Sequence, residues 1–230
     1  MAKKQPLFFH TLEDAIRVYK QYCKPAQDLE VAVAKAIYTQ LGNGFTEAEL
    51  AEYLLCGSHQ WPFRMPCNQQ KRANAISALV NAKLWNGQYK DFEDLHDTVM
   101  REVGSCKGVG LLTRYDIAKK LSGIFDDSIR PNEKVYLQSG ALKGAFNLTG
   151  NADYTNKPQV KEDTTLLQDL LHEKMSSIDI ENFLCIFKSV LVKGSVDPNI
   201  PFVPFCCEFN PRELNPQSRD KVMALAKQLG

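Results

Sequence analysis

The sequence predicts an all-α protein, and three observations carry this prediction. Apolar residues recur at intervals of three and four along most of the chain, which places them on one face of a helix. Several of these segments begin with Ser, Thr or Asp, the residues that cap helix N-termini. No stretch alternates convincingly between apolar and polar residues with the period of two that is typical of a half-buried strand. We therefore expect one compact multi-helix fold.

The first third of the chain predicts three helices. The first begins at Thr11, a capping residue, and the second is rich in alanine and ends at a Gly-Asn-Gly turn. The third begins with Thr46 and carries Glu49 three positions later, which is the pattern of a capping box. The expected ranges are 11–22, 27–41 and 46–55.

The remaining chain continues this pattern with three interruptions. We expect an irregular aromatic loop at 57–66, a polar surface loop at 151–162 and an extended apolar plug at 200–209, where two prolines oppose a helix. One of the later helices is expected to be capped by Ser177 or Asp179. The helices expected here are 68–84, 91–102, 111–121, 131–147, 164–174, 177–190 and 216–229.

The composition is that of an ordinary soluble globular protein. Of the 230 residues, 44% are hydrophobic and 24% are charged, and the formal net charge is +1. A chain this close to neutral has no global basic field, so any contact with nucleic acid must come from a local patch. We expect a single all-helical domain over 1–230, within which 1–66 could form an N-terminal helical subdomain packed on a hairpin-containing core at 67–230.

Cysteine usage and hydropathy predict a cytoplasmic protein without a membrane partner. Seven cysteines without regular spacing favour free thiols in a reducing compartment. The first residues lack the apolar core of a secretory signal, and no apolar run approaches the roughly 20 residues that span a bilayer. Cys56, His59 and Cys67 would supply three ligands of a zinc site, which needs four. No fourth is visible nearby, so we expect neither a metal nor a cofactor.

The most informative segment contains Gly108-Val109-Gly110 between two expected helices. Two glycines around one apolar residue let the backbone turn tightly and expose its N–H groups. Those groups would lie at the start of the second helix, where the helix dipole favours an anion. This layout is typical of a helix-hairpin-helix, which holds a nucleic-acid phosphate without reading the base sequence. The predicted DNA phosphate-binding residues are Lys107, Gly108, Val109, Gly110, Leu112 and Arg114.

The cations near these glycines have two interpretations. They could form a basic patch that faces DNA, or they could belong to a solvated helix face whose charge is diluted by Glu102 and Asp116. The cations concerned are Lys107, Arg114, Lys119 and Lys120.

Three sequence elements occur in the order of a known family. A first helix has Lys, Ala, Ile and Leu at family spacing, residues 106–113 approximate a Leu-Pro-Gly-Val-Gly-x-Lys-Thr hairpin, and residues 131–135 take the place of a Val-Asp-Thr-His-Val segment. The matching positions of the first helix are Lys71, Ala73, Ile76 and Leu79. Residues 71–145 together thus resemble the core of the helix-hairpin-helix DNA glycosylase superfamily. The resemblance covers about a third of the chain and implies an all-α fold that binds DNA.

Several positions depart from the family pattern. Leu112 stands where the family's lyases have the lysine that forms a Schiff base, so the resemblance implies no lyase nucleophile. Asn132 stands where the family has an activating aspartate, unless the register shifts by one residue and Glu133 supplies the carboxylate. Asn132 and Glu133 are therefore the candidate catalytic residues. Arg114 replaces a small alanine, and either disturbs the packing of the two helices or directs a cation at a phosphate.

Three functions remain open at this point. The first is a DNA-binding protein on a glycosylase-like scaffold that lacks the usual catalytic residues and binds duplex DNA weakly, without sequence preference. The second is a monofunctional base-excising glycosylase that uses Glu133. The third is a protein-interaction module whose hairpin is purely structural. We prefer the first because the departures fall on the residues that carry the family's chemistry. The sequence leaves the oligomeric state open.

Overall fold

A computed structural model describes residues 5–57, 69–125, 129–203 and 208–230. Helices account for 61% of the described residues and strands for 9%. The prediction of a largely helical protein is therefore confirmed, although two small two-stranded sheets accompany the helices.

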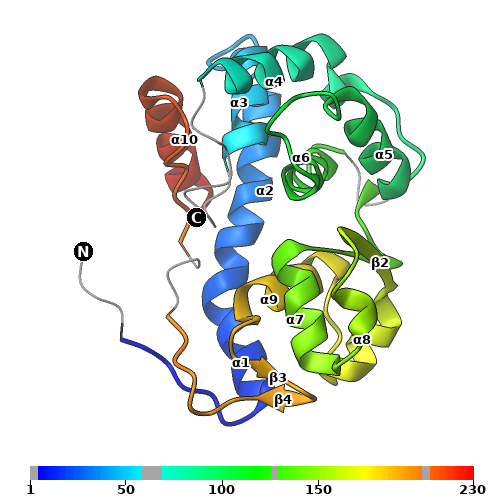
Figure 1. Cartoon of the computed structure of the whole chain (residues 1–230). Coiled ribbons are helices and arrows are strands. Elements are labelled where there is room, and N and C mark those ends of the chain that lie inside the picture. Colours follow the sequence, from blue (N-terminus) through cyan, green and yellow to red (C-terminus); the bar gives the residue numbers. More distant parts are fainter. Residues whose placement is uncertain (1–4, 58–68, 126–128, 204–207) are drawn as a thin grey trace. The chain divides into compact units, whose positions relative to one another are not determined.

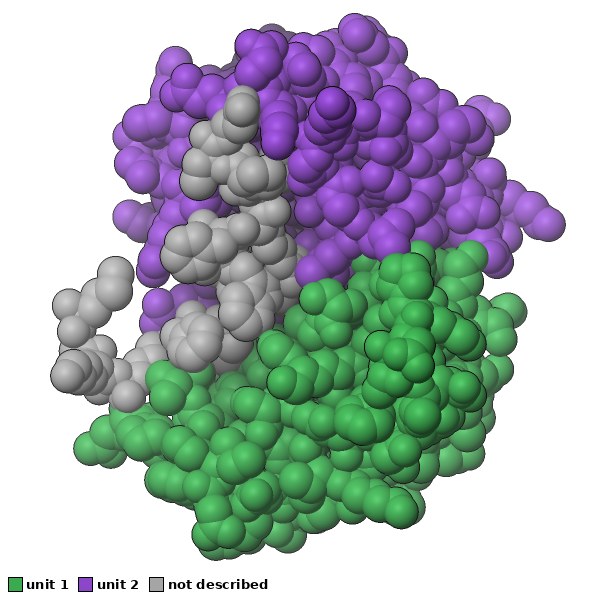
Figure 2. All heavy atoms as spheres, viewed as in Figure 1, with its two compact units in different colours: residues 1–25, 131–207 green, residues 26–130, 208–230 purple. Residues whose placement is uncertain are grey.

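The chain divides into two compact units, which Figure 2 colours separately. Unit 1 comprises residues 1–25 and 131–207, and unit 2 comprises residues 26–130 and 208–230. The chain thus passes from one unit to the other three times. The sequence predicts a single domain over 1–230, within which 1–66 could form a subdomain. We describe each unit separately.

Unit 2 contains six α-helices among its described residues (Figure 1). Helix α3 (Glu47–Cys56) shows how a local sequence signal starts one of them. Its expected capping box is present: Thr46 Oγ1 accepts a hydrogen bond from the Glu49 amide at 3.2 Å, and the Glu49 carboxylate accepts one from the Thr46 amide at 2.8 Å. The helices are α2 (Lys24–Thr39), α3 (Glu47–Cys56), α4 (Gln69–Ala82), α5 (Phe92–Glu102), α6 (Leu111–Ser122) and α10 (Pro216–Leu229).

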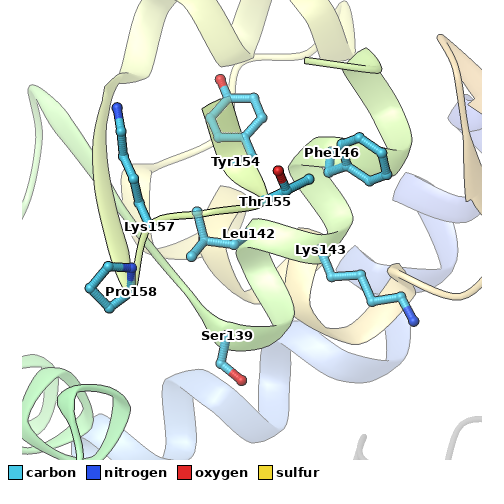
Figure 3. Close-up of a pocket in the computed structure, with 8 residues that line it drawn as sticks. All are labelled: Ser139, Leu142, Lys143, Phe146, Tyr154, Thr155, Lys157 and Pro158. Carbon is cyan, nitrogen blue, oxygen red and sulfur yellow. The ribbon is translucent and has the colours of Figure 1, made fainter. Parts of the chain in front are cut away.

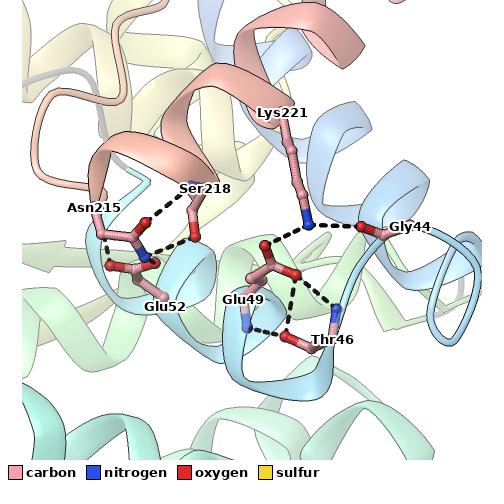
Figure 4. A network of polar contacts seen from close by, with 7 residues as sticks. All are labelled: Gly44, Thr46, Glu49, Glu52, Asn215, Ser218 and Lys221. Carbon is pink, nitrogen blue, oxygen red and sulfur yellow. Dashed lines mark hydrogen bonds and ion pairs between the residues drawn. The ribbon is translucent and has the colours of Figure 1, made fainter.

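The C-terminal helix α10 is tied to α3 by charged and polar contacts (Figure 4). The ammonium group of Lys221 donates to Glu49 at 2.8 Å. The Asn215 amide N–H donates to the Glu52 carboxylate at 3.0 Å, and the Asn215 side chain caps α10 by accepting from the Ser218 amide at 2.9 Å. These contacts make residues 208–230 part of unit 2.

Unit 1 combines helices with short strands. Its strands β1 and β2 pair antiparallel, with Lys134 opposite Asp163 and Gln138 opposite Gln159. The elements are α1 (Leu12–Val18), a π-helical turn (Tyr19–Cys23), β1 (Lys134–Gln138), α7 (Ser139–Thr149), a 3₁₀ turn (Ala152–Tyr154), β2 (Gln159–Asp163), α8 (Thr164–Leu171), α9 (Ser177–Phe187), β3 (Leu191–Val192) and β4 (Ser195–Val196).

Helix α9 forms the centre of unit 1, because ten of its eleven residues are buried. Helix α7 packs against it (Figure 1). Gly144 makes this approach possible, since a Cβ atom at that position would overlap the carbonyl oxygen of Leu184. At the end of α9 the ring of Phe187 stacks on Phe202 with 4.3 Å between the ring centroids. Unit 1 therefore has its own aromatic and aliphatic core.

The structure corrects the predicted helix at 131–147 and the predicted loop at 151–162. Residues 134–138 form β1, and residues 159–163 form its partner β2. Four consecutive residues of β1 are buried, so the strand carries no alternation of apolar and polar residues. A run of this kind cannot be distinguished from a buried helix by periodicity alone.

Two further expectations need correction. Cys23 is disulfide-bonded, so the expectation of free thiols is wrong at this position, whereas Cys56, Cys106 and Cys185 form no disulfide. Helix α9 is capped by Ser176, one residue before the predicted candidates. Among the described residues, the structure contains no helix with the length and hydropathy needed to cross a bilayer.

Candidate functional site

The glycine segment singled out by the sequence connects α5 to α6, which pack against each other in unit 2 (Figure 1). We call residues 103–110 the α5–α6 turn. Its backbone is held by hydrogen bonds from the Cys106 amide to the Val103 carbonyl and from the Val109 amide to the Cys106 carbonyl, both 3.1 Å. Val103 and Val109 are buried, so apolar contacts anchor both ends of the turn.

Gly108 and Gly110, which end the turn, have different roles. Gly108 has a φ of +95°, a backbone conformation that residues with a side chain adopt only under strain. Gly110 has an ordinary φ of −75°, and no heavy atom lies within 4 Å of the position that a Cβ would take. Of these two glycines, only Gly108 is therefore required by the backbone. Gly110 instead leaves the start of α6 uncovered.

The start of α6 is suited to an anion. Gly110 is its N-cap, so no capping side chain accepts a hydrogen bond from the first turn, and that turn has no acidic residue. By contrast, α3 begins with the Thr46–Glu49 capping box. The first amides of a helix point outward and carry a partial positive charge. An external anion can therefore take the place of the missing cap.

Arg114 closes the turn on itself. Its Nε donates to the Val109 carbonyl at 3.0 Å, and its Nη2 donates to the Gly104 carbonyl at 2.8 Å. The two expected roles were to disturb the packing of α5 on α6 or to direct a cation at a phosphate, whereas both of these hydrogen bonds go to the backbone of the turn itself. The main role of Arg114 in the structure is to hold the carbonyl groups of the turn.

The expected basic patch is smaller than the sequence suggested. Lys119 and Lys120 are buried, and each faces a carboxylate at 3.5 Å, Asp116 for the first and Glu30 for the second. Neither can contact DNA from that position. Lys107 is exposed, and no described residue forms an ion pair with it. The cation that remains available at the α5–α6 turn is therefore Lys107.

The other predicted residues are divided between the units. Leu112 is half-buried in the first turn of α6, in unit 2. Asn132 and Glu133 are exposed in unit 1, immediately before β1. Their main-chain carbonyl groups accept hydrogen bonds from Ser177 Oγ at 3.1 Å and from the Thr164 amide at 3.0 Å, respectively. Both positions are thus fixed by their backbone while their side chains face outward.

The possible zinc ligands give no metal site among the described residues, where no group of His, Cys, Asp and Glu side chains could hold an ion. Burial raises the pKa of the Cys56 thiol to about 11. A metal ligand must be a thiolate, so this environment disfavours metal binding by Cys56. His59 and Cys67 lie outside the described residues.

Sequence reasoning missed a pocket in unit 1, beside α7. Ser139, Lys143 and Lys157 are among its lining residues (Figure 3). The predicted helix at 131–147 concealed the strand-to-helix junction at Ser139, which has a φ of +39°. Lys143 and Lys157 could have signalled an anion site in the sequence, but only the fold brings Lys157 close to α7.

Comparison with protein-family models, with curated proteins and with solved structures gives no match to this chain.

Proposed function

We propose that this protein binds duplex DNA through the α5–α6 turn, acting as a helix-hairpin-helix on a glycosylase-like scaffold. One observation carries the proposal: the exposed start of α6 has neither a capping side chain nor an acidic residue, directly after a turn that needs a glycine. A phosphate oxygen would accept hydrogen bonds from the amides of this first turn. The contact would be to the DNA backbone and would carry no base-sequence information.

The same site explains why the binding should be weak. The ammonium group of Lys107 adds one mobile positive charge, whereas Arg114 is engaged by two carbonyl groups and Lys119 is buried. The net charge of the chain is only +1. Affinity for DNA rises with the number of phosphates that are neutralised, so a site with one free cation predicts low affinity and a shallow salt dependence.

We further propose that DNA binding, and not base excision, is the role of this scaffold. Leu112 has no nitrogen with which to form an imine, so lyase chemistry at that position is excluded. Asn132 cannot supply the negative charge that stabilises an oxocarbenium-like centre. The exposed Glu133 carboxylate is the remaining candidate for chemistry, and a base-excision assay with Glu133→Gln tests it.

The decisive variants are Gly110→Asp and Gly110→Asn. Both side chains can cap α6, and the open space around Gly110 accommodates either one. The Asp variant also places a negative charge where the phosphate would lie. We expect its duplex affinity to fall at least about tenfold while its thermal stability is unchanged or higher, because Asp and Gly differ by only a few tenths of a kcal/mol as caps. The neutral Asn variant should lose less affinity.

Lys107→Gln tests the charged contact separately. Removal of one phosphate contact should reduce the slope of log affinity against log salt by about 0.9 for duplex DNA. The matched control is Lys90→Gln. Lys90 is also exposed, but it lies just before the N-terminus of α5, whereas the α5–α6 turn follows the C-terminus of that helix. If the wild-type protein binds no duplex at low salt, the turn is structural and the interaction-module function replaces this proposal.

A further inference from the structure

Unit 1 contains an open pocket of about 430 Å³ (Figure 3). It is bounded by α7, by the 3₁₀ turn that follows this helix, and by the segment that leads into β2. A volume of this size lies in the range of pockets that hold small ligands or single nucleotide units. All of its lining residues belong to unit 1, so it is separate in sequence from the α5–α6 turn.

The pocket is positively charged. Lys143 and Lys157 line it, and no lining residue is acidic. Both side chains are exposed, and neither forms an ion pair with a described residue. Figure 3 shows their ammonium groups on opposite sides of the pocket. A ligand that satisfies both must therefore carry two separated negative charges or one extended anionic chain.

Three other lysines of unit 1 differ in this respect, because they are paired with carboxylates. The pairs are Lys20 with Glu173, Lys24 with Asp179 and Lys134 with Asp163.

Between the lysines the pocket presents an apolar aromatic surface. The side chain of Phe146 is 37% exposed, and Leu142 lies beside it. Tyr154 completes this wall with a buried ring whose hydroxyl donates to the Glu162 carboxylate at 2.8 Å. That hydrogen bond fixes the tyrosine ring. The exposed phenyl ring offers a flat surface on which a planar group can stack.

We propose that this pocket binds a segment of single-stranded DNA, with one base against the Phe146 ring and the neighbouring phosphates at Lys143 and Lys157. Aromatic rings for stacking, interleaved with cations that follow the backbone, are the two features by which proteins hold single strands without reading sequence. The proposal takes DNA as the partner from the proposed function, but it depends on different residues in the other unit. It adds a second, single-strand site to the duplex site.

The test measures fluorescence anisotropy of a labelled oligothymidine strand of about 12 nucleotides, at low salt, with the full chain. Phe146→Ala should weaken binding about tenfold, as expected for the loss of one stacked base. The double variant Lys143→Gln, Lys157→Gln should lower the slope of log affinity against log salt by about 1.4, which is two phosphate contacts at about 0.7 each for a single strand. The matched control is Lys174→Gln, Lys193→Gln, which removes two exposed lysines of unit 1 that do not line the pocket and should leave the slope unchanged.

The outcomes separate this site from the duplex site. The proposal is supported if Phe146→Ala weakens oligothymidine binding and leaves duplex binding intact. Gly110→Asp should weaken duplex binding and leave oligothymidine binding intact. If Gly110→Asp leaves duplex binding unchanged, the proposed duplex site at the α5–α6 turn is contradicted, but the single-strand site in unit 1 is not. The single-strand proposal is overturned if the wild type does not bind oligothymidine, if Phe146→Ala binds it equally well, or if the control pair changes the slope as much as the pocket pair does.

Discussion

The ammonium group of Lys120 lies 3.5 Å from the carboxylate of Glu30, and neither side chain is accessible to solvent. Tyr53 joins the pair from α3: its carbonyl oxygen lies 3.4 Å from the lysine nitrogen, and its hydroxyl donates to the Glu30 main-chain carbonyl at 2.8 Å. This cluster connects α2, α3 and α6 inside unit 2. Burial lowers the pKa of Lys120, while the nearby Glu30 charge opposes that shift.

Breaking this pair should destabilise the protein more than replacing it. Lys120→Met leaves the Glu30 carboxylate buried without its cation, and we expect a loss of about 3–5 kcal/mol in the free energy of unfolding. Combining it with Glu30→Gln removes both charges, so the double variant should be more stable than Lys120→Met alone. Urea unfolding of the wild type, both single variants and the double variant measures the coupling. Equal stability of Lys120→Met and wild type would contradict a structural role for the pair.

The Cys56 thiol should make stability depend on pH in the alkaline range. Its pKa is raised from 9.0 to about 11, chiefly by burial, so the folded protein retains a proton that the unfolded chain releases. The contribution is fully present below pH 9 and is lost as the pH rises to about 11, up to about 3 kcal/mol in total. The measurement is the difference between wild type and Cys56→Ala at each pH, because other buried groups titrate in the same range. Cys106→Ala is the control. The prediction is refuted if the difference in free energy of unfolding between wild type and Cys56→Ala does not change between pH 9 and about pH 11.

Arg114 should stabilise the α5–α6 turn, so its removal should affect stability as well as DNA binding. Hydrogen bonds from a charged donor contribute about 1.5–3 kcal/mol, and Arg114→Met loses two of them while retaining an apolar stem of similar length. We expect faster amide hydrogen exchange at Val109 and a lower midpoint of thermal unfolding. Arg101→Gln is the comparison, because that exposed side chain pairs with its neighbour Glu102 at the surface and should matter little. An unchanged exchange rate at Val109 would show that the turn holds its shape without the guanidinium.

Incubation with damaged and mismatched duplexes should release no free base, and no strand cleavage should follow. The basis is the proposed family resemblance, which would place Leu112 at the position of the lyase lysine and Asn132 at the position of the activating aspartate. Glu133→Gln should behave as the wild type does. Base release by the wild type that is abolished in Glu133→Gln would establish the monofunctional glycosylase alternative.

The elements that the sequence predicts well are those with local signals. The Thr46–Glu49 capping box forms as expected, and Thr11 caps α1 by accepting a hydrogen bond from the Asp14 amide at 3.1 Å. Such caps depend on residues three positions apart, so no knowledge of the tertiary fold is needed. The strand β1 lacked any comparable signal, because its residues are buried consecutively and its partner lies some 25 residues later, at 159–163.

The candidate site was predictable in its backbone but not in its charges. Gly108 adopts the left-handed conformation that a tight glycine turn implies. Nothing local distinguishes Lys107, which is exposed, from Lys120, which is buried against α2, because the distinction is made by helices far away in the sequence. The roles of Asn132 and Glu133 stay predictions until the excision assay is done.

The division of unit 1 into two separate stretches of chain has a consequence for the order of assembly during synthesis. The Tyr19 hydroxyl donates a hydrogen bond to the Asp179 carboxylate at 2.9 Å, across 160 positions of sequence. The N-terminal stretch therefore leaves the ribosome long before the residues that bury it have been made. The segment 26–130 can begin to collapse while α1 still lacks its partners. A nascent chain stalled at residue 130 would thus expose the apolar face of α1, which makes the first helix to be synthesised one of the last to be packed.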